Sequence, residues 1–279
     1  MILVTGGSGQ LANEFKKIIP ENESLILNKL SCDIVDLPSL EEIFSRQKIK
    51  LIINCAAYTN VEKAEQEVDQ AFLVNALGAK NVAIVAKKYN IPLVHISTDY
   101  VFDGSSNVPI CETDKVNPLS VYGKSKLKGE EEILKIAPNG AIIRTSWLYS
   151  CDGKNFVTTI SKVGLEKKHL KVIIDQVGSP TNAKDLAEFI MKIYPKITSK
   201  KIEIYNFSNE GVASWYDFAQ AVIEYKKINC VVDPIKTKDY SSNVQRPAYS
   251  VLDKEKISKE FGVIPKNWRE SLKSCIFHE

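Results

Sequence analysis

Tyr122 and Lys126 stand four residues apart in the stretch VYGKSKLKGE, which covers residues 121–130. On a helix, residues with this spacing share one face, so both side chains point the same way. A phenol with a pKa near ~10 is a poor acid or base at neutral pH, and a nearby ammonium lowers that pKa by favouring the phenolate. The pair therefore has the composition of a general acid–base centre, in which we expect Lys126 to lower the pKa of Tyr122.

A plainer interpretation is an amphipathic helix whose tyrosine packs and whose lysine is solvated, because Y-x-x-x-K is too short to be specific. Two neighbouring segments favour the catalytic interpretation. HISTDYVFDG ends a predicted strand with Ser97, Thr98 and Asp99, where a hydroxyl can hydrogen-bond a reacting carbonyl. RTSWLY ends the next predicted strand with Trp147, whose ring either lines a substrate pocket or packs in the core.

A second group of residues has the spacing of a nucleotide-binding loop. VTGGSGQLA follows the first predicted strand and opens the first predicted helix, with Gly6, Gly9 and Ala12 at G-x-x-G-x-x-A spacing. The first glycine permits a sharp turn, the second lets the backbone approach a pyrophosphate, and a small third residue lets helix and strand pack closely. The helix N-terminus offers unpaired N–H groups to the phosphates. A turn without a ligand has the same pattern, but the position in the chain favours a dinucleotide.

Further candidates for the cofactor follow the next two strands. Ligands of open α/β sheets bind at the carboxyl edge, which CDI and NCAAYT reach. The candidates in these segments are Asp33, Ile34, Ala56, Ala57 and Tyr58. The second strand ends in Asn28 and Lys29, neither the acidic residue typical of NAD sites nor the arginine typical of NADP sites, so both nucleotides remain open.

Alternating strands and helices must position these groups. Short β-branched runs are predicted as strands and amphipathic stretches as helices. The predicted strands are 2–6, 25–28, 51–56, 92–98 and 141–147, and the predicted helices are 10–19, 37–47, 121–136 and a long helical region at 61–89. This alternation predicts an α/β fold with a Rossmann-type doubly wound parallel sheet.

The alternation of strands and helices becomes less regular after Trp147, which predicts a smaller C-terminal lobe. Helices are predicted near 155–167, 183–193 and 215–227, with strands at 170–175 and 202–208 and a turn at 178–180. We expect residues 1–150 to form the dinucleotide-binding domain, with later segments returning to it. Residues 151–279 would mainly form the substrate-binding lobe.

Composition narrows the classes of function. The 279 residues are 44% hydrophobic, enough for a sizeable core, and the net charge of +3 is spread along the chain, which does not favour nucleic acid as a partner. No apolar run has membrane-spanning length and no signal segment opens the chain, so we expect a cytoplasmic protein without a membrane partner. The six cysteines stand alone, which predicts reduced thiols and no structural zinc.

Seven motifs in order give a more specific indication: GGSGQLA, NCAAYTNVEKAE, STDYVFDG, NPLSVYGKSKLKGE, RTSWLY, DQVGSPT and QRPAYSVLD. With them the chain resembles the extended short-chain dehydrogenase/reductases and, within these, the dTDP-4-dehydrorhamnose reductase family. The resemblance implies that Tyr122 is the proton donor, Lys126 its partner and a ribose ligand, and Thr98 the third catalytic residue. Asp99 and Trp147 would contact the sugar. The cofactor, NADPH or NADH, would contact Gly6, Gly9, Gln10, Leu11, Asp33, Ile34, Ala56, Ala57, Tyr58, Ser97, Tyr122 and Lys126.

The implied reaction is hydride transfer to the C4 carbonyl of dTDP-4-dehydro-L-rhamnose. The product, dTDP-L-rhamnose, is a precursor of cell-surface polysaccharide. Arg246 in QRPAY is a candidate for the substrate diphosphate, because a guanidinium binds phosphate oxygens bidentately. The remaining interpretations are a reductase or epimerase of another nucleotide sugar and a non-catalytic regulatory subunit on the same fold.

The assembly of the chain is open between a monomer and a homodimer. Some members of this family dimerise around Mg²⁺ held by glutamates. Glu14 stands at one of these positions, but Lys184 stands at the other, which argues against a metal-bridged dimer and a metal site.

Overall fold

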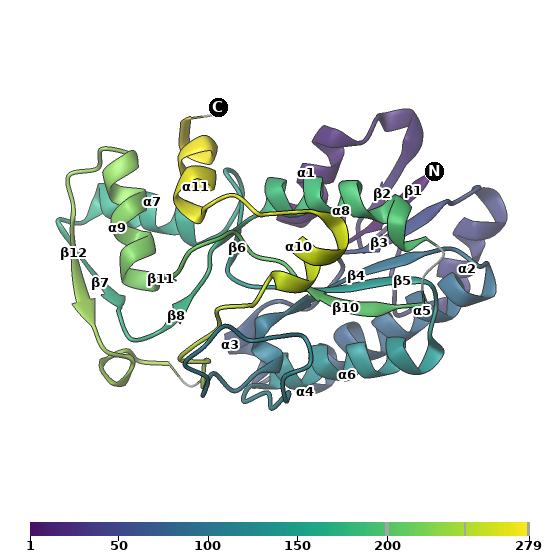
Figure 1. Cartoon of the computed structure of the whole chain (residues 1–279), viewed down its shortest axis with the longest axis horizontal. Helices are drawn as coiled ribbons and strands as arrows, with labels where there is room; N and C mark the ends of the chain where they lie inside the picture. The colour runs from purple at the N-terminus through teal and green to yellow at the C-terminus, as the bar shows by residue number, and fades with distance from the viewer. Residues whose placement is uncertain (199–200, 243, 278–279) are drawn as a thin grey trace.

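Six short strands pair into one parallel sheet at the centre of the larger lobe, in the order β10-β5-β4-β3-β1-β2 (Figure 1). The computed structural model describes residues 1–198, 201–242 and 244–277. Across the sheet, the strands are β10 (Glu203–Asn206), β5 (Gly140–Thr145), β4 (Leu93–Thr98), β3 (Leu51–Asn54), β1 (Ile2–Thr5) and β2 (Ser24–Leu27). The strand order reverses between β1 and β3. In open α/β sheets, ligands bind at the carboxyl ends of the strands beside such a reversal.

Successive apolar residues of each strand point to opposite faces of the sheet. In β1, Ile2 and Val4 belong to one core cluster and Leu3 to the other. In β3, Leu51 and Ile53 likewise belong to the first cluster and Ile52 to the second. Because both faces are covered, the strands are apolar along most of their length. The predicted doubly wound α/β architecture is confirmed.

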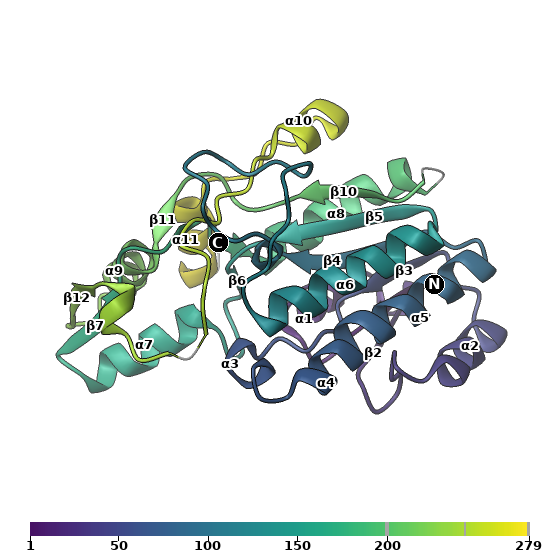
Figure 2. The same ribbon diagram turned by 90° about the horizontal axis from the view of Figure 1, so that it is seen from below.

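Two sets of helices cover the sheet (Figures 1 and 2). The first face packs against α1 (Gln10–Ile18), α8 (Ala183–Ile197) and α10 (Glu255–Phe261). The second face packs against α2 (Leu37–Arg46), α5 (Ala79–Lys88) and α6 (Val121–Ile136). The helices predicted at 10–19, 37–47 and 121–136 are confirmed, and none ends more than one residue from its predicted end.

The long helical region predicted at 61–89 is helical but divided. It consists of α3 (Val61–Ala64), α4 (Val68–Phe72), the π-helix η2 (Leu73–Gly78) and α5. Glu67, with φ −107° and ψ 49°, separates α3 from α4. The π-helix carries Asn75, whose side-chain amide donates to Ser125 Oγ of α6 at 2.9 Å and to the Tyr58 carbonyl at 3.0 Å. This turn therefore ties α6 to the loop after β3.

The smaller lobe, on the left in Figure 1, has its own core cluster. Its helices are α7 (Phe156–Glu166), α9 (Trp215–Tyr225) and α11 (Trp268–Phe277). Its paired strands are β7 (His169–Ile173) with β12 (Val231–Ile235), and β8 (Val177–Gly178) with β11 (Ala213–Ser214). The remaining elements are β6 (Leu148–Tyr149) paired with β9 (Thr181–Asn182), and the 3-10 turns η1 (Glu21–Glu23), η3 (Asp99–Val101) and η4 (Thr237–Asp239). Although β10 and α8 follow residue 150, they belong to the large sheet and its cover.

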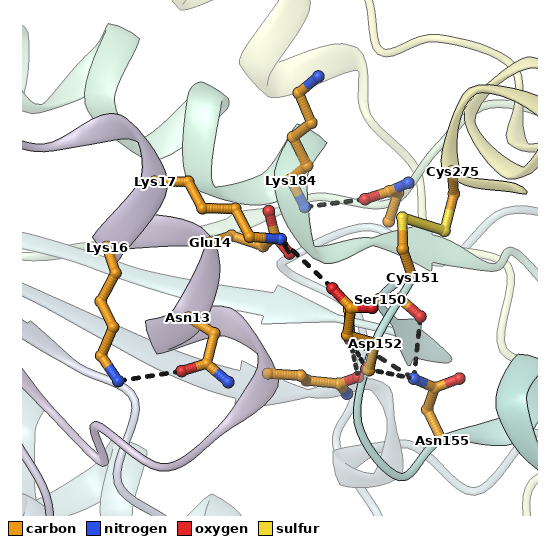
Figure 3. A network of polar contacts seen from close by, with 12 residues as sticks. Asn13, Glu14, Lys16, Lys17, Ser150, Cys151, Asp152, Asn155, Lys184 and Cys275 are labelled. Atoms are coloured by element: carbon orange, nitrogen blue, oxygen red, sulfur yellow. Dashed lines mark hydrogen bonds and ion pairs between the residues drawn. A yellow bond between two sulfur atoms is a disulfide. The ribbon is translucent and has the colours of Figure 1, made fainter. Parts of the chain in front are cut away.

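Two of the cysteines are paired. Cys151, after β6, forms a disulfide with Cys275 of α11, although 124 residues separate them in sequence (Figure 3). The packing of α11 brings their Cα atoms to 5.2 Å, within the range in which disulfides form. The expectation that all six cysteines are reduced is therefore wrong for this pair, because nothing in the local spacing indicates a contact across the lobe. Cys32, Cys55, Cys111 and Cys230 are free.

Candidate active site

The glycine loop brings the start of α1 to the carboxyl edge of the sheet. Gly6 has φ +71°, and a Cβ at this position would lie 2.7 Å from the backbone nitrogen of Ala56. Only glycine fits this turn without strain. Gly9 is the N-cap residue of α1 and has no side chain to accept from the first-turn N–H groups. The positive end of the helix dipole is thus free to meet an anion such as a phosphate.

A cleft of about 590 Å³ opens in front of this helix end. Its volume lies within the usual range of small-molecule sites. The predicted site residues among its lining are Gly9, Gln10, Leu11, Ala57, Ser97, Thr98, Asp99, Tyr122, Lys126, Trp147 and Arg246. The fold therefore gathers the predicted catalytic, sugar and diphosphate residues around one cavity, with the helix end beside them.

Thr98 and Asp99 occupy the point where β4 ends and η3 begins. Thr98 Oγ1 accepts from the Tyr100 N–H at 3.2 Å and donates to Asp99 Oδ1 at 3.0 Å. Asp99 is 2% exposed, and its Oδ2 has no hydrogen-bond partner among the described residues. Burial raises the pKa of Asp99 to about 6, although the nearby hydroxyls of Ser250 and Thr98 oppose this shift.

Tyr122 lies in the first turn of α6, which other elements hold in place. Ser120 caps this helix by accepting from the Gly123 N–H at 3.1 Å, and Glu65 accepts from the Val121 N–H at 2.8 Å. A Cβ on Gly123 would lie 2.2 Å from the Tyr100 carbonyl, so the absence of a side chain lets α6 approach η3. The rings of Tyr100 and Tyr122 then meet edge to face at 5.5 Å.

Burial raises the pKa of Tyr122 above its ordinary value, and a hydrogen bond with Thr98 opposes this only in part. The expectation that Lys126 lowers this pKa is wrong for the arrangement seen here. Lys126 Nζ instead donates to the Ile96 carbonyl at 2.6 Å and lies 3.3 Å from His95 Nε2. Burial lowers the pKa of Lys126 to about 8, while the charge of Glu130 opposes that shift. The phenol is therefore protonated at neutral pH, as a proton donor must be.

Trp147 adopts an unusual backbone conformation in the cleft wall. Its φ of +48° lies in the left-handed region, which is rare for a bulky residue and concentrates at functional sites. The indole stacks on that of Trp215 with ring centroids 3.6 Å apart and an interplanar angle of 6°. Both rings line the cavity, so Trp215 at the start of α9 supports Trp147 of the RTSWLY motif.

Arg246 lines the cleft from the segment that precedes Leu252, which forms an isolated β-bridge with Ile110. Its Nη2 donates to Glu62 Oε1 at 2.8 Å, and Nη1 lies 3.5 Å from the Tyr100 hydroxyl. Its Nε is buried without a hydrogen-bond partner among the described residues. A buried guanidinium N–H without an acceptor is costly, and an anionic ligand would satisfy it.

The other predicted cofactor residues lie outside the lining of this cavity. Gly6 and Ala56 form the close approach described above, and Ile34 packs in the second core cluster. Asp33 accepts from the Val35 N–H at 3.1 Å and lies 4.0 Å from Lys29 Nζ. Tyr58 donates its hydroxyl to Glu67 at 2.6 Å. These residues surround the ends of β1, β2 and β3, beyond the helix end that faces the cleft.

Gln10 connects the glycine loop to β6 and the chain that follows it. Its Nε2 donates to the Leu148 carbonyl at 3.0 Å, and Ser150 Oγ donates to its Oε1 at 3.1 Å. Asn155 donates to the Ser150 carbonyl at 2.9 Å, and residues 152–155 line the cleft. The disulfide at Cys151 anchors this segment to α11. The segment is therefore fastened on both sides of the cavity.

Glu14, the one glutamate at an expected metal position, pairs with Lys17 at 2.9 Å (Figure 3). The side chain of Lys184 extends away from that carboxylate (Figure 3). Among the described residues, no group of three or more histidine, cysteine or acidic side chains has the arrangement of a metal site. No helix in the same part of the chain has the length and apolarity that crossing a bilayer requires.

Several residues that line the cleft are not predicted from the sequence. Trp215 begins a helix with no motif around it, and Tyr100 and Thr145 stand beside predicted residues without a signal of their own. Thr145 is the last residue of β5, so the rule that ligands bind at strand ends indicates it once the strand boundary is known. Trp215 has no such signal, because its place depends on how the smaller lobe packs.

The whole chain, residues 1–279, matches the family described as RmlD substrate binding domain. A Bacillus subtilis relative named spore coat polysaccharide biosynthesis protein SpsK is 40% identical over 277 residues, with 99% of this chain and 96% of that protein covered. A solved dTDP-4-dehydrorhamnose reductase from Clostridium acetobutylicum has a TM-score of 0.95 and 39% identity, with 99% of this chain and 98% of that chain covered. A dTDP-4-dehydrorhamnose reductase from Bacillus anthracis, solved in complex with NADP, has a TM-score of 0.95 and 32% identity, with 100% and 99% covered.

Proposed function

The chain belongs to the RmlD substrate binding domain family, and from this membership we propose that it reduces the C4 keto group of dTDP-4-dehydro-L-rhamnose to give dTDP-L-rhamnose. The observation that carries the proposal is the meeting of Thr98, Tyr122 and Lys126 in one cleft beside the N-terminus of α1. The family and this geometry together indicate an oxidoreductase that acts on a nucleotide sugar. The product is a precursor of surface polysaccharide.

The cofactor is NADPH or NADH. Gly9 leaves the first turn of α1 without a side-chain cap, so this helix end is suited to the pyrophosphate. When bound, the nicotinamide supplies the hydride that C4 of the sugar accepts. Asn28 accepts from the Leu30 and Ser31 N–H groups in its own turn. The end of β2 therefore presents Lys29 in place of a carboxylate. This position is compatible with the 2′-phosphate of NADPH and also with the 2′-hydroxyl of NADH.

The catalytic residues handle the carbonyl oxygen. Thr98 Oγ1 turns its hydrogen from Asp99 to this oxygen and fixes the direction of the C=O bond. Tyr122 Oη donates its proton to the oxygen while C4 becomes tetrahedral. Lys126 lies one turn further along α6, where its ammonium would donate to a ribose hydroxyl of the cofactor. Burial of these groups excludes water from the reacting atoms.

The sugar occupies the space between the two lobes. Trp147 contacts its apolar face, and the partnerless Oδ2 of Asp99 accepts from a sugar hydroxyl. The guanidinium of Arg246 binds the diphosphate through the N–H groups that Glu62 leaves free. Residues 1–150 and the returning segments hold the dinucleotide, and the remainder mainly holds the sugar nucleotide. The protein acts as a monomer or homodimer.

A coupled assay tests the reaction. It contains dTDP-glucose, a 4,6-dehydratase, a 3,5-epimerase and this protein with NADPH or NADH, and it follows the loss of absorbance and identifies the product. We expect dTDP-L-rhamnose, and we expect Tyr122→Phe to lower kcat by ~10²- to 10⁴-fold while its NADPH affinity is kept. The same assay without the epimerase tests reduction of the unepimerised sugar. Turnover in that arm alone would assign another sugar reductase, and binding of nucleotide without turnover in either arm would indicate a regulatory subunit.

A further inference from the structure

A row of buried polar side chains crosses the sheet beneath Lys126. Thr5 pairs with Asn54 in the register of β1 and β3, and Asn54 pairs with His95 in the register of β3 and β4. All three are at most 1% exposed. They point to the face that α6 covers, because each lies two residues after an apolar residue of the second core cluster. The proposed mechanism uses none of them.

The hydrogen bonds along this row have a fixed direction. Asn54 Oδ1 accepts from Thr5 Oγ1 at 2.6 Å and from the Ala56 N–H at 3.2 Å. A backbone N–H can only donate, so the amide oxygen must lie on that side and the amide nitrogen on the other. Asn54 Nδ2 therefore donates to His95 Nδ1, which lies 3.0 Å away. This ring nitrogen accepts and carries no hydrogen.

The second ring nitrogen then faces the lysine with its hydrogen. Burial and the charge of Lys126 keep the pKa of His95 well below its ordinary value, so the ring is neutral. A neutral imidazole whose Nδ1 accepts carries its hydrogen on Nε2. That N–H points at Lys126 Nζ, 3.3 Å away, while the Ile96 carbonyl accepts from Nζ at 2.6 Å.

We infer that His95, held in its Nε2–H tautomer by Asn54 and Thr5, is a positioning residue for Lys126. The Nε2–H of His95 can donate to the neutral amine of Lys126, but it faces the N–H groups of the Lys126 ammonium unfavourably. His95 therefore helps to set the pH at which Lys126 changes charge. This rests on the role proposed for Lys126 in the reduction. His95 cannot pass a proton onward, because the Asn54 amide occupies its other nitrogen.

Other titratable groups face Lys126 from its surroundings. Glu130 lies one turn further along α6 and is held by Arg144 Nη2 at 2.7 Å. Cys55 comes from the end of β3, and Tyr122 from the preceding turn of α6. Variants at Asn54 and His95 leave Glu130, Cys55 and Tyr122 in place. The effect of these variants on Lys126 can therefore be separated from the effect of the surrounding charges.

The tautomer can be measured without turnover. The chain has three histidines, and nitrogen-detected NMR of ¹⁵N-histidine-labelled protein shows which ring nitrogen carries the hydrogen. His95→Gln identifies the His95 signals by their loss. We expect a neutral ring protonated on Nε2 across the pH range in which the protein is folded. A hydrogen on Nδ1, or a ring that becomes charged near neutral pH, would overturn the inference whether or not the proposed reaction is correct.

Asn54→Asp reverses the row and tests its effect on Lys126. The carboxylate of Asn54→Asp accepts from His95 Nδ1–H, so His95 Nε2 becomes an acceptor for the Lys126 ammonium. The new negative charge also favours the charged form of Lys126 and raises its pKa by about one unit or more. Because Lys126 is charged below its pKa, we expect the basic limb of the kcat/KM profile to move upward by about one unit. NADPH affinity and thermal unfolding show that the variant is folded. An unmoved limb in the folded variant contradicts the inference.

His95→Gln provides the second variant if Asn54→Asp does not fold. A glutamine can turn its amide oxygen to the ammonium, so the basic limb again moves upward, while KM for the sugar changes little. His169→Gln is the matched control, because His169 is exposed and pairs with Asp233 in the smaller lobe. It should leave the limb in place. If neither His95→Gln nor Asn54→Asp moves the limb relative to this control, His95 is only structural.

Discussion

In the proposed reaction, the charge states of single residues would decide the direction of proton transfer. A buried phenol with a raised pKa gives up its proton only when something accepts it, which suits Tyr122 to protonate a reduced carbonyl. Lys126, with a pKa near 8, changes charge closer to neutral pH. The two groups are therefore coupled through the reaction rather than through a hydrogen bond in the resting chain.

Asp99 makes stability depend on pH. Its pKa is about 6, whereas an unfolded aspartate titrates near ~4. Between these values the folded state holds the proton that the unfolded state releases, so stability falls as pH rises and is constant above about 6. We expect Asp99→Asn to gain up to roughly 3 kcal/mol relative to the parent between pH 4 and pH 7.

Denaturant unfolding of the parent and Asp99→Asn across this pH range measures that gain. The proposed sugar contact adds a second expectation, a lower kcat/KM in the variant. A difference in stability that stays constant with pH would show that Asp99 is ionised as readily in the folded chain as in the unfolded one.

Arg246 should affect substrate binding more than cofactor binding. Removal of a guanidinium that hydrogen-bonds a charged group costs about 1.5–3 kcal/mol, so Arg246→Ala should raise KM for the sugar nucleotide by ~10- to 100-fold. Arg246→Lys should recover part of this loss as a point charge. Arg269→Ala, which removes an arginine packed on Trp268, is the control. An unchanged KM in Arg246→Ala would exclude the diphosphate contact.

The close approach of α6 to η3 positions Tyr122. Gly123→Ala improves intrinsic helix propensity by about 1 kcal/mol, but its Cβ would lie 2.2 Å from the Tyr100 carbonyl. We expect a net destabilisation of about 1–3 kcal/mol and a lower kcat, because Tyr122 must move with the helix.

Thermal unfolding and steady-state kinetics of Gly123→Ala test this expectation. Lys124→Ala on the exposed face of the same helix should stay within about 0.5 kcal/mol of the parent. If both variants behave alike, α6 has room to move away from η3 and Gly123 does not position the tyrosine.

The elements also show what the sequence can and cannot predict. The bounds of α6 and the turn at Gly6 follow from local patterns, and the structure has both. Asn54 ends the apolar strand β3 and His95 lies inside β4, and their contact depends on the register of these two strands. The pKa of Tyr122 differs from the expectation for a related reason: helical spacing shows that Lys126 shares its face, but not that Lys126 Nζ donates to the Ile96 carbonyl. Local pattern therefore predicts elements, while contacts between elements decide the chemistry.

The disulfide joins the segment beside the cleft to the C-terminal helix α11. Titration of the denatured, unreduced protein should find the four thiols of Cys32, Cys55, Cys111 and Cys230, and all six cysteines only after reduction. Closing a loop across 124 residues should stabilise the fold by about 2–4 kcal/mol, a difference that unfolding with and without a dithiol reductant measures. Six thiols in the unreduced protein would show that the pair is open in solution.

The stacked indoles of Trp147 and Trp215 have an optical consequence. The chain has three tryptophans, and the third, Trp268, is 2% exposed in the core of the smaller lobe. Two of the three fluorophores thus line the cavity, Trp147 from the segment after β5 and Trp215 from the start of α9. A sugar bound against Trp147, as proposed, would change the polarity around both rings, and a reduced nicotinamide bound nearby would absorb the light they emit. We therefore expect intrinsic fluorescence to report occupancy of the cleft directly, without label or coupled enzyme.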